Sequence, residues 1–266
     1  MCNIHEHAVL TDVLEPKGSS FIGHHGDDFL PANDLAWVGF SVEIGPEGGV
    51  YVLDWHDQNI CGNEVKFPNS GRIFRVMPTG VKDTVTPDLS AMSDAELVEY
   101  QLHSNDWFVR HARTLLQYRQ ASGTLNRKVV HQKLSDILNT TSEPSKRLRA
   151  LWALYVTDGL AVNRLYELLN DTDEHVRAWS IQFLCDVSES NAFQRERNAD
   201  WLLEPDVLEK LTSMAQDDPS QVVRLYLASA VQRLPFVQRW SILQGLISHA
   251  EDCLLYTSPS PRDRSL

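Results

Sequence analysis

The stretch HVRAWSIQFL, residues 175–184, places an arginine directly after Val176 and returns to apolar residues three and seven positions after that valine. This spacing puts the apolar side chains on one face of an α-helix, which repeats about every 3.6 residues. The same pattern occurs in three further segments, WFVRHARTLL (107–116), RLRALWALYV (147–156) and VVRLYLASAV (222–231). The recurrence predicts one helical unit that is used four times.

The arginines of the pattern recur irregularly around the period of about 40 residues that is typical of HEAT-type helix pairs. They are Arg110, Arg149, Arg177 and Arg224, and residues of helix-capping type precede them by four positions: Asp106, Ser145, Asp173 and Ser220. We expect the arginines to pair with capping acids or carbonyls of neighbouring repeats, and partner helices to occupy 128–138, 162–169 and 206–215. The tryptophans Trp107, Trp152, Trp179, Trp201 and Trp240 are expected in the core. An α-solenoid over residues 88–252 is predicted, with an irregular helical bundle as the alternative.

Residues 1–87 have a different pattern, with most of the glycines of the chain. GFSVEI (39–44) alternates apolar and polar residues, and VYVLDW (50–55) is a nearly continuous apolar run, as expected of a strand covered on both faces. With GRIFRVM (71–77) these segments predict three antiparallel strands, most of one blade of a β-propeller, whereas residues 1–38 are expected to be mainly loop. The predicted fold is thus mixed β and α: a partial β-propeller in 1–87, followed by the solenoid.

Composition excludes several classes of protein. The net charge of −12 would repel nucleic acid and anionic membranes, so a nucleic-acid partner is not expected. We expect no transmembrane segment, and the first residues lack the basic-then-apolar layout of a secretory signal. The four cysteines, Cys2, Cys61, Cys185 and Cys253, form no CxxC motif that would indicate a zinc or covalent haem site.

Two polar clusters are candidates for a site. The loop after residues 50–55 carries Asp54, His56, Asp57 and Cys61, and a carboxylate at the end of an apolar strand needs a partner or an ion. The alternative is that Asp54 caps the following loop through backbone N–H groups. The second cluster consists of His24, His25, Asp27 and Asp28. Neither cluster has a diagnostic spacing of metal ligands, so exposed loop histidines are the alternative and no metal is predicted.

The sequence also resembles a known family. The runs NIHEHAVLTDVLEPKGSSFIGHHGDDFLPAND (3–34), GPEGGVYVLDWHDQNICG (45–62), DLSAMSDAELVEYQLHSNDWFVRHARTLLQYR (88–119) and DDPSQVVRLYLASAVQRLP (217–235) carry the resemblance. They are similar to the PVC-type membrane-bound dehydrogenases, in which a propeller like that of sorbosone and glucose dehydrogenases precedes HEAT-like repeats. Many members end in a cytochrome c domain. The resemblance extends from Asn3 to Asp252.

The resemblance implies a fragment of an extracytoplasmic, periplasmic dehydrogenase that oxidises a sugar or alcohol, with pyrroloquinoline quinone and haem c as cofactors of the parent protein. Asp54, His56, His24 and His25 are the candidates for cofactor binding in this chain. Without upstream propeller blades the chain is expected to contribute scaffold and to be inactive by itself. The alternative is a non-enzymatic module whose solenoid binds a protein partner.

The end of the sequence differs in style from the repeats. CLLYTSPSPRD (253–263) has two prolines in a serine-rich stretch, which prevents a helix there. It is also the peptide that one reading frame of a transposon-based sequencing adapter encodes. We therefore interpret residues 253–266 as translated adapter and omit them from the fold prediction.

Overall fold

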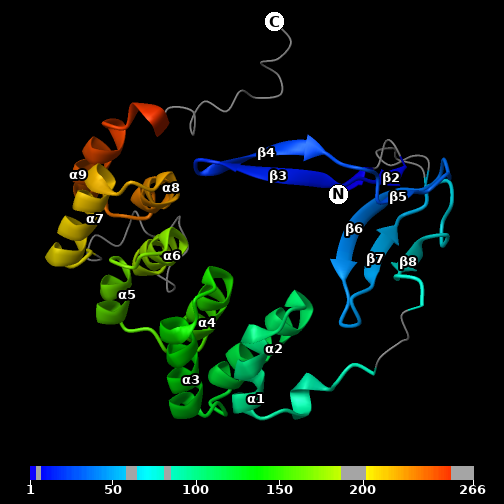
Figure 1. Ribbon diagram of the computed structural model, residues 1–266, viewed down its shortest axis with the longest axis horizontal. Helices are drawn as coiled ribbons and strands as arrows, with labels where there is room; N and C mark the ends of the chain where they lie inside the picture. The colour runs from blue at the N-terminus through cyan, green and yellow to red at the C-terminus, as the bar shows by residue number, and fades with distance from the viewer. Residues whose placement is uncertain (4–6, 58–64, 81–84, 187–201, 253–266) are drawn as a thin grey trace, which may run out of the picture. The chain divides into compact units, whose positions relative to one another are not determined.

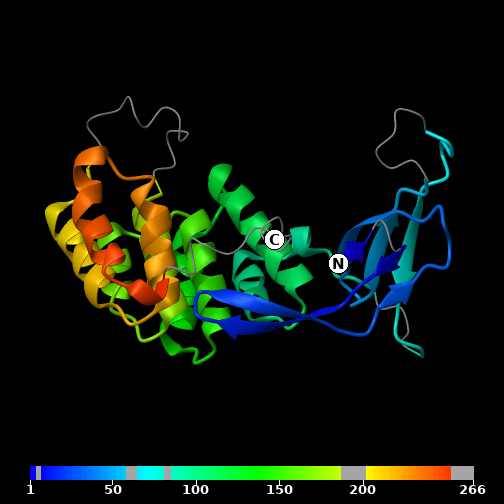
Figure 2. The same ribbon diagram turned by 90° about the horizontal axis from the view of Figure 1, so that it is seen from above.

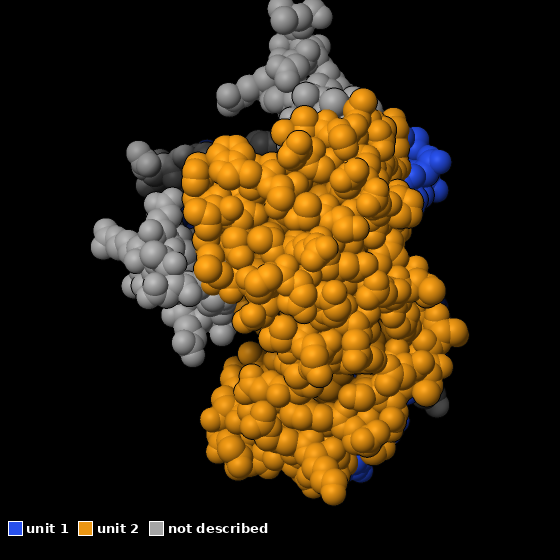
Figure 3. Space-filling view, turned by 90° about the vertical axis from the view of Figure 1, so that its left-hand side faces the viewer, with its two compact units in different colours: residues 1–16, 21–115 blue, residues 17–20, 116–266 orange. Residues whose placement is uncertain are grey.

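The computed structural model describes residues 1–3, 7–57, 65–80, 85–186 and 202–252. The chain forms two compact units: unit 1 comprises residues 1–16 and 21–115, and unit 2 comprises residues 17–20 and 116–266 (Figure 3). The division falls after Leu115, so the predicted domain boundary at 87/88 stays a prediction. The predictions for Cys61, Trp201 and residues 253–266 lie outside the described residues.

Strands occur throughout the first part of the chain, where mainly loop was predicted. β1 (Cys2–Asn3), β2 (Ala8–Val9) and β5 (Leu30–Pro31) form one small sheet, while β3 (Asp12–Lys17) and β4 (Ser20–His25) form a two-stranded sheet. The loop prediction was wrong for β3 and β4. Every residue of these two strands is exposed, so neither strand has a buried face that an alternating apolar pattern in the sequence would indicate. Gly18 between them has a φ of +58°, which glycine adopts without strain.

The prediction of three antiparallel strands is confirmed. β6 (Gly39–Ile44), β7 (Val50–Asp54) and β8 (Arg72–Val76) form a sheet in that order, with Val42 opposite Val52 and Val52 opposite Phe74. The described strands form small antiparallel sheets, and no closed propeller is found among them.

Burial on this sheet differs from the prediction for residues 50–55. β7 is not covered on both faces, and the apolar face of β6, formed by Phe40, Val42 and Ile44, is exposed. Only Val52 and Asp54 of β7 are buried. The core of this region instead joins Val52 to Val9 and Trp37, which the apolar pattern of a single strand cannot indicate.

The helical part agrees closely with the sequence prediction. The helices are α1 (Asp94–Glu99), α2 (Asp106–Ala121), α3 (Arg127–Thr140), α4 (Pro144–Val156), α5 (Val162–Leu168), α6 (Glu174–Leu184), α7 (Pro205–Asp217), α8 (Gln221–Val231) and α9 (Phe236–Ile247), with short 3-10 turns at Leu89–Ala91, Tyr100–Leu102 and Ala250–Asp252. The partner helices expected at 128–138, 162–169 and 206–215 correspond to α3, α5 and α7, and are confirmed.

Two of the four predicted helix caps are confirmed. The side chains of Asp173 and Ser220 accept N–H bonds at the starts of α6 and α8. Ser145 lies inside α4 because Pro144 takes the first helical position, where its fixed φ suits the helix and its missing N–H costs nothing. Asp106 is the first residue of α2, and the Trp107 N–H bonds to the side chain of Asn105 instead.

Unit 2 is built from two layers of helices (Figure 1 and Figure 2). In one layer α4 packs on α6, and α6 packs on α8. The helices α3, α5 and α7 pack on these three in turn, and α9 packs on α7 and α8. Regular stacking of helix pairs is the arrangement of a solenoid and not of an irregular bundle.

Candidate functional site

Asp54 ends β7 with a side chain that is fully bonded inside the protein. One carboxylate oxygen accepts the N–H groups of Val38 at 2.8 Å and His56 at 2.9 Å, and the other accepts Arg72 Nε at 2.8 Å. Asp54 is 3% exposed. The bond from the His56 N–H is the loop-capping interaction that the sequence offered as an alternative.

His56 follows in a left-handed conformation, with φ of +52°. Its Nε2 lies 3.5 Å from a carboxylate oxygen of Asp34, and its ring stacks on Phe67. Nδ1 is buried and has no partner within the described part of the chain. The Arg72 guanidinium donates to Asp34 at 2.7 Å and holds the pKa of that carboxyl below its ordinary value. The structure therefore brings Asp54 and His56 together around Arg72, in a cluster that braces the loop.

Replacing Asp54 by alanine is expected to lower the free energy of unfolding by about 3 kcal/mol, because it leaves two backbone N–H groups and Arg72 without their acceptor. Urea unfolding monitored by hydrogen exchange of residues 50–54 measures the change. Asp28→Ala is the matched control, since that carboxylate is 45% exposed and the ion pair it forms among the described residues is with His25 at 3.5 Å. Equal effects of the two substitutions would contradict the bracing role.

His24 and His25 lie on β4, apart from this cluster. His24 Nε2 is 3.2 Å from Glu15, and His25 is 3.6 Å from Asp12. The side chains of both histidines are more than half exposed, and no hydrogen bond or ion pair between described residues joins them to Asp54 or His56. Over the described ranges, no group of three or more His, Cys, Asp or Glu side chains is placed to hold a metal ion. Cofactor binding by these four residues stays a prediction.

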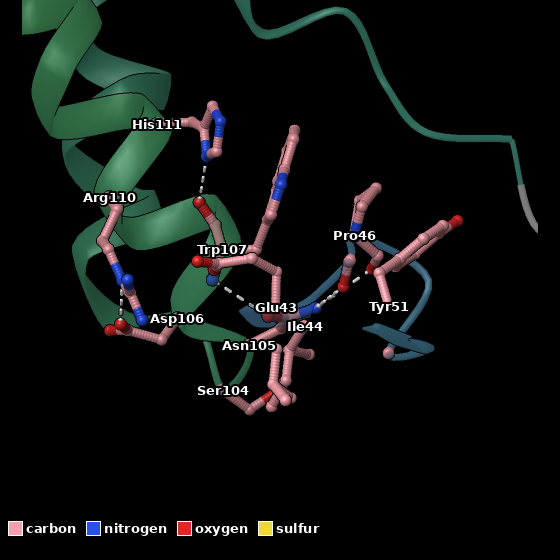
Figure 4. Close-up of a pocket in the computed structure, with 13 residues that line it drawn as sticks. Glu43, Ile44, Pro46, Tyr51, Ser104, Asn105, Asp106, Trp107, Arg110 and His111 are labelled. Carbon is pink, nitrogen blue, oxygen red and sulfur yellow. Dashed lines mark hydrogen bonds and ion pairs between the residues drawn. The ribbon is translucent and has the colours of Figure 1, made fainter. Parts of the chain in front are cut away.

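A groove of about 1030 Å³ lies in unit 1 between the β6–β7 turn and the start of α2 (Figure 4). Asn105 joins its two sides, because its side-chain amide donates to the carbonyls of Gly45 at 2.9 Å and Pro46 at 3.1 Å. The Trp107 and His111 rings stack with their centroids 3.8 Å apart. Arg110 Nε donates a hydrogen bond of 2.5 Å to Asp106. The groove therefore offers the ring surfaces of Trp107 and His111 and not a set of convergent catalytic groups.

A ladder of arginine and aspartate side chains, the Arg–Asp ladder, joins successive repeats of unit 2. Arg147 forms a two-pronged pair with Asp171, at 2.9 and 2.6 Å, and Arg177 does the same with Asp218, with both distances 2.9 Å. Arg224 pairs in the same way with Asp252.

The rungs of the ladder are linked through the backbone. Arg177 also donates to the carbonyl of Asp171, and Arg224 to the carbonyl of Asp218, so each arginine contacts the aspartate residue of the previous rung. Asp171 and Asp218 in turn accept the N–H two residues further on, just before the next helix begins. The arginine and aspartate side chains of the ladder thus connect successive repeats and also bond to the backbone of the turns between them.

The prediction that the repeat arginines bond to neighbouring repeats is confirmed for Arg177 and Arg224. On α4 the ladder position belongs to Arg147 and not to Arg149, and Arg110 pairs with Asp106 of its own helix. The signal that could have identified the ladder is an aspartate three residues before a helix, as in Asp171 and Asp218.

The free energy of unfolding is expected to fall at acidic pH, because the aspartates of the Arg–Asp ladder become protonated. The Arg224 bonds hold the pKa of Asp252 below its ordinary value, and Arg147 does so for Asp171 although burial opposes it. A lowered pKa contributes stability that is present above the unfolded value of about 3.9 and is lost as the pH falls through the folded value. Urea unfolding of the wild type should therefore weaken more steeply below about pH 4 than that of Asp171→Asn. Parallel curves would contradict this role.

Aromatic rings form a row across the α4–α6–α8 layer, the aromatic row. Trp152 meets Trp179 with the ring centroids 5.1 Å apart, and Trp179 meets Tyr226 at 6.0 Å. All three residues are half-buried. Beside them Tyr155 stacks on Phe183 at 3.9 Å and donates to Asp186, and burial followed by this bond raises the pKa of Tyr155 to about 12.

The prediction that the solenoid tryptophans are core residues holds only in part. Trp107, Trp152 and Trp179 are half-buried, but Trp240 is 58% exposed on α9. Among the tryptophans that the structure describes, the fully buried one is Trp37, which is 1% exposed and lies in the segment expected to be loop. Helical periodicity identifies a face of a helix and does not say whether a neighbour covers it.

No described helix is long and apolar enough to cross a membrane. No curated protein and no solved structure matches the chain. Residues 132–232, from within α3 to the end of α8, match the family model of HEAT repeats. This segment contains the first two rungs of the Arg–Asp ladder and the aromatic row, and its similarity to HEAT repeats confirms the repeat type predicted from the arginine period.

Proposed function

We propose that the chain is a protein-interaction module whose HEAT-like solenoid binds a partner. The observation that carries this proposal is the aromatic row, in which Trp152, Trp179 and Tyr226 come from three successive helices of one layer. Half-buried aromatic side chains supply contact area at a low cost in conformational entropy and are enriched among the residues that dominate binding energy.

The surroundings of the row support binding more than catalysis. Arg147 and Arg177 of these repeats are engaged in the Arg–Asp ladder. Tyr155 is held protonated by burial and by its bond to Asp186. A rigid stack with fixed rings binds a segment without first having to order its own side chains. A peptide segment with apolar anchors is the partner that this surface suits.

A peptide-display selection against the 266-residue chain tests the proposal. We expect enriched peptides to bind Trp179→Leu at least about tenfold more weakly than the wild type, because the central ring of the row is lost. Tyr118→Leu on α2 is the matched control, since that ring is 67% exposed and lies outside the row. Peptides that bind all three proteins equally would refute a site on the aromatic row.

The second candidate is a part of a PVC-type membrane-bound dehydrogenase, located outside the cytoplasm. It is supported by the order of three antiparallel strands, β6 to β8, followed by HEAT-like repeats, which is the order in that family. In this proposal Asp54, His56, His24 and His25 contribute to cofactor binding, while pyrroloquinoline quinone, haem c and the sugar or alcohol substrate belong to the longer protein.

Titration of the chain with pyrroloquinoline quinone tests this candidate. Because Asp54 is already fully bonded, His24→Gln and His56→Gln are the informative variants, and both should weaken binding if these residues contribute. Absence of saturable binding to the wild type would remove these residues from the cofactor site. Sugar oxidation by the chain alone would contradict its role as scaffold.

A further inference from the structure

The groove of unit 1 between the β6–β7 turn and the start of α2 is lined by an acidic residue, Glu43 (Figure 4). Two arginines lie on the elements around the groove, and each of them pairs with another acid. Arg110 of α2 donates to Asp106 at 2.5 Å, and Arg75 of β8 lies 3.8 Å from Glu47. The Glu43 side chain is exposed, and its carboxylate forms no hydrogen bond or ion pair within the described residues. Glu43 is therefore the unpaired charge of this groove.

Aromatic rings lie beside this carboxylate. Glu43 of β6 is directly opposite Tyr51 of β7, so the two side chains share one face of the sheet. On the other side of the groove the Trp107 ring is stacked with His111 on one of its faces. Trp107 and Tyr51 are half-buried, and both line the groove. The groove thus combines a carboxylate with ring surfaces, the two features that attract a cation.

Unit 1 already holds one arginine with this combination of groups. The Arg72 guanidinium lies 5.2 Å from the ring centroid of Phe74 and donates to the carboxylates of Asp34 and Asp54. A guanidinium is planar, so it can stack on a ring while its N–H groups pair with a carboxylate, whereas the ammonium of lysine is a compact point charge. The groove presents the same two kinds of group around Glu43.

We propose that this groove binds an arginine side chain of a partner protein, with the guanidinium on the Trp107 ring and paired with Glu43. The partner segment is basic, because the groove has an unpaired carboxylate and the chain carries a net charge of −12. A volume of about 1030 Å³ exceeds what one side chain fills, so the residues on both sides of the arginine fit as well. The site shares no residue with the aromatic row, and it takes a cation instead of an apolar anchor.

The walls of the groove are fixed before a ligand binds. The side-chain amide of Asn105 donates to the carbonyls of Gly45 and Pro46 and so ties the β6–β7 turn to the start of α2. The Tyr51 hydroxyl donates to Glu47 at 2.5 Å, and this bond raises the pKa of Tyr51, so the ring keeps its neutral hydroxyl at neutral pH. An arginine can therefore bind without first ordering these groups.

Fluorescence anisotropy of a labelled, capped peptide tests the proposal on the 266-residue chain. The peptide carries one central arginine between serines and glycines, and we expect saturable binding. Citrulline in place of the arginine has the same shape but no charge, and should weaken binding at least about tenfold. Glu43→Gln should weaken binding of the arginine peptide about fivefold. Glu209→Gln on α7 is the matched control, since it removes the same charge at an exposed position outside the groove.

The ring contribution is tested separately. Trp107→Leu should weaken binding of the arginine peptide at least about fivefold, and Trp107→Phe should weaken it less, because phenylalanine keeps a ring face. Circular dichroism shows whether these two variants fold, while Glu43→Gln and the citrulline peptide test the site without changing a packed ring. Equal effects of Glu43→Gln and Glu209→Gln would show attraction to net charge alone and overturn the proposal. Equal binding of the citrulline peptide, or no saturable binding by the wild type up to about 1 mM, would also overturn it.

Discussion

Replacing Arg177 by alanine is expected to lower the free energy of unfolding of the solenoid by about 3–5 kcal/mol, because it leaves a buried carboxylate without its cation. Asp218 accepts two bonds from Arg177 and is 9% exposed, and the same guanidinium holds the carbonyls of Asp171 and Thr172. Arg177→Lys keeps the charge but not the planar fork, so an intermediate loss is expected.

The thiol of Cys185 provides a local readout of this effect. It lies at the end of α6, the helix of Arg177, and burial raises its pKa to about 12. Since the thiolate is the reactive form, labelling of Cys185 near neutral pH requires unfolding. Mass spectrometry of the labelled peptides in urea would then report the stability of this part of the chain.

Arg110→Ala is the matched control for the Arg177 substitution. Arg110 belongs to the same sequence pattern, but its side chain is 64% exposed and pairs with Asp106 within one helix turn. Such pairs contribute about 0.3–0.5 kcal/mol. If the two alanine variants lost similar amounts of stability, the Arg–Asp ladder would not be the element that connects the repeats.

Replacing Trp37 by alanine is expected to cost about 3–5 kcal/mol in the stability of unit 1. Trp37 is 1% exposed and forms the centre of a small core with Val9 and Val52. Hydrogen exchange of the β7 backbone measures the loss, since β7 carries Val52. Trp55→Ala is the control: at 56% exposure its removal should cost less than about 1 kcal/mol.

Gly39 provides a second test of the packing around Trp37. A Cβ atom at position 39 would lie 2.1 Å from the indole ring, so Gly39→Ala should itself be strongly destabilising. In the Trp37→Ala background the ring is gone, and the same substitution should cost much less. Additive effects of the two substitutions would show that the ring and Gly39 do not meet.

The repeat arginines show how far sequence reasoning reaches. Helical period identified the helices, and the positions of Arg177 and Arg224 led to their bonds with other repeats. The helical period selected Arg149, whereas the ladder uses Arg147. Both arginines of RLRALW fit a helical face, and only the position of Asp171 in space shows which of the two forms the ion pair. The chemistry of the candidate site was likewise visible in Asp54, but its partners Val38 and Arg72 were not, since they come from other segments.

The sequence by itself determined the local structure of this protein: the helices and their approximate ends, the three strands β6 to β8 and the HEAT-like repeat. These follow from side-chain period and capping, which act over a few residues. Only the tertiary structure decided which faces are covered. It placed Trp37 at the centre of a core, left Phe40 and Trp240 exposed, and formed β3 and β4 from residues that are all on the surface. The reason is that burial depends on which distant segment packs on a face, and a single segment does not carry that information.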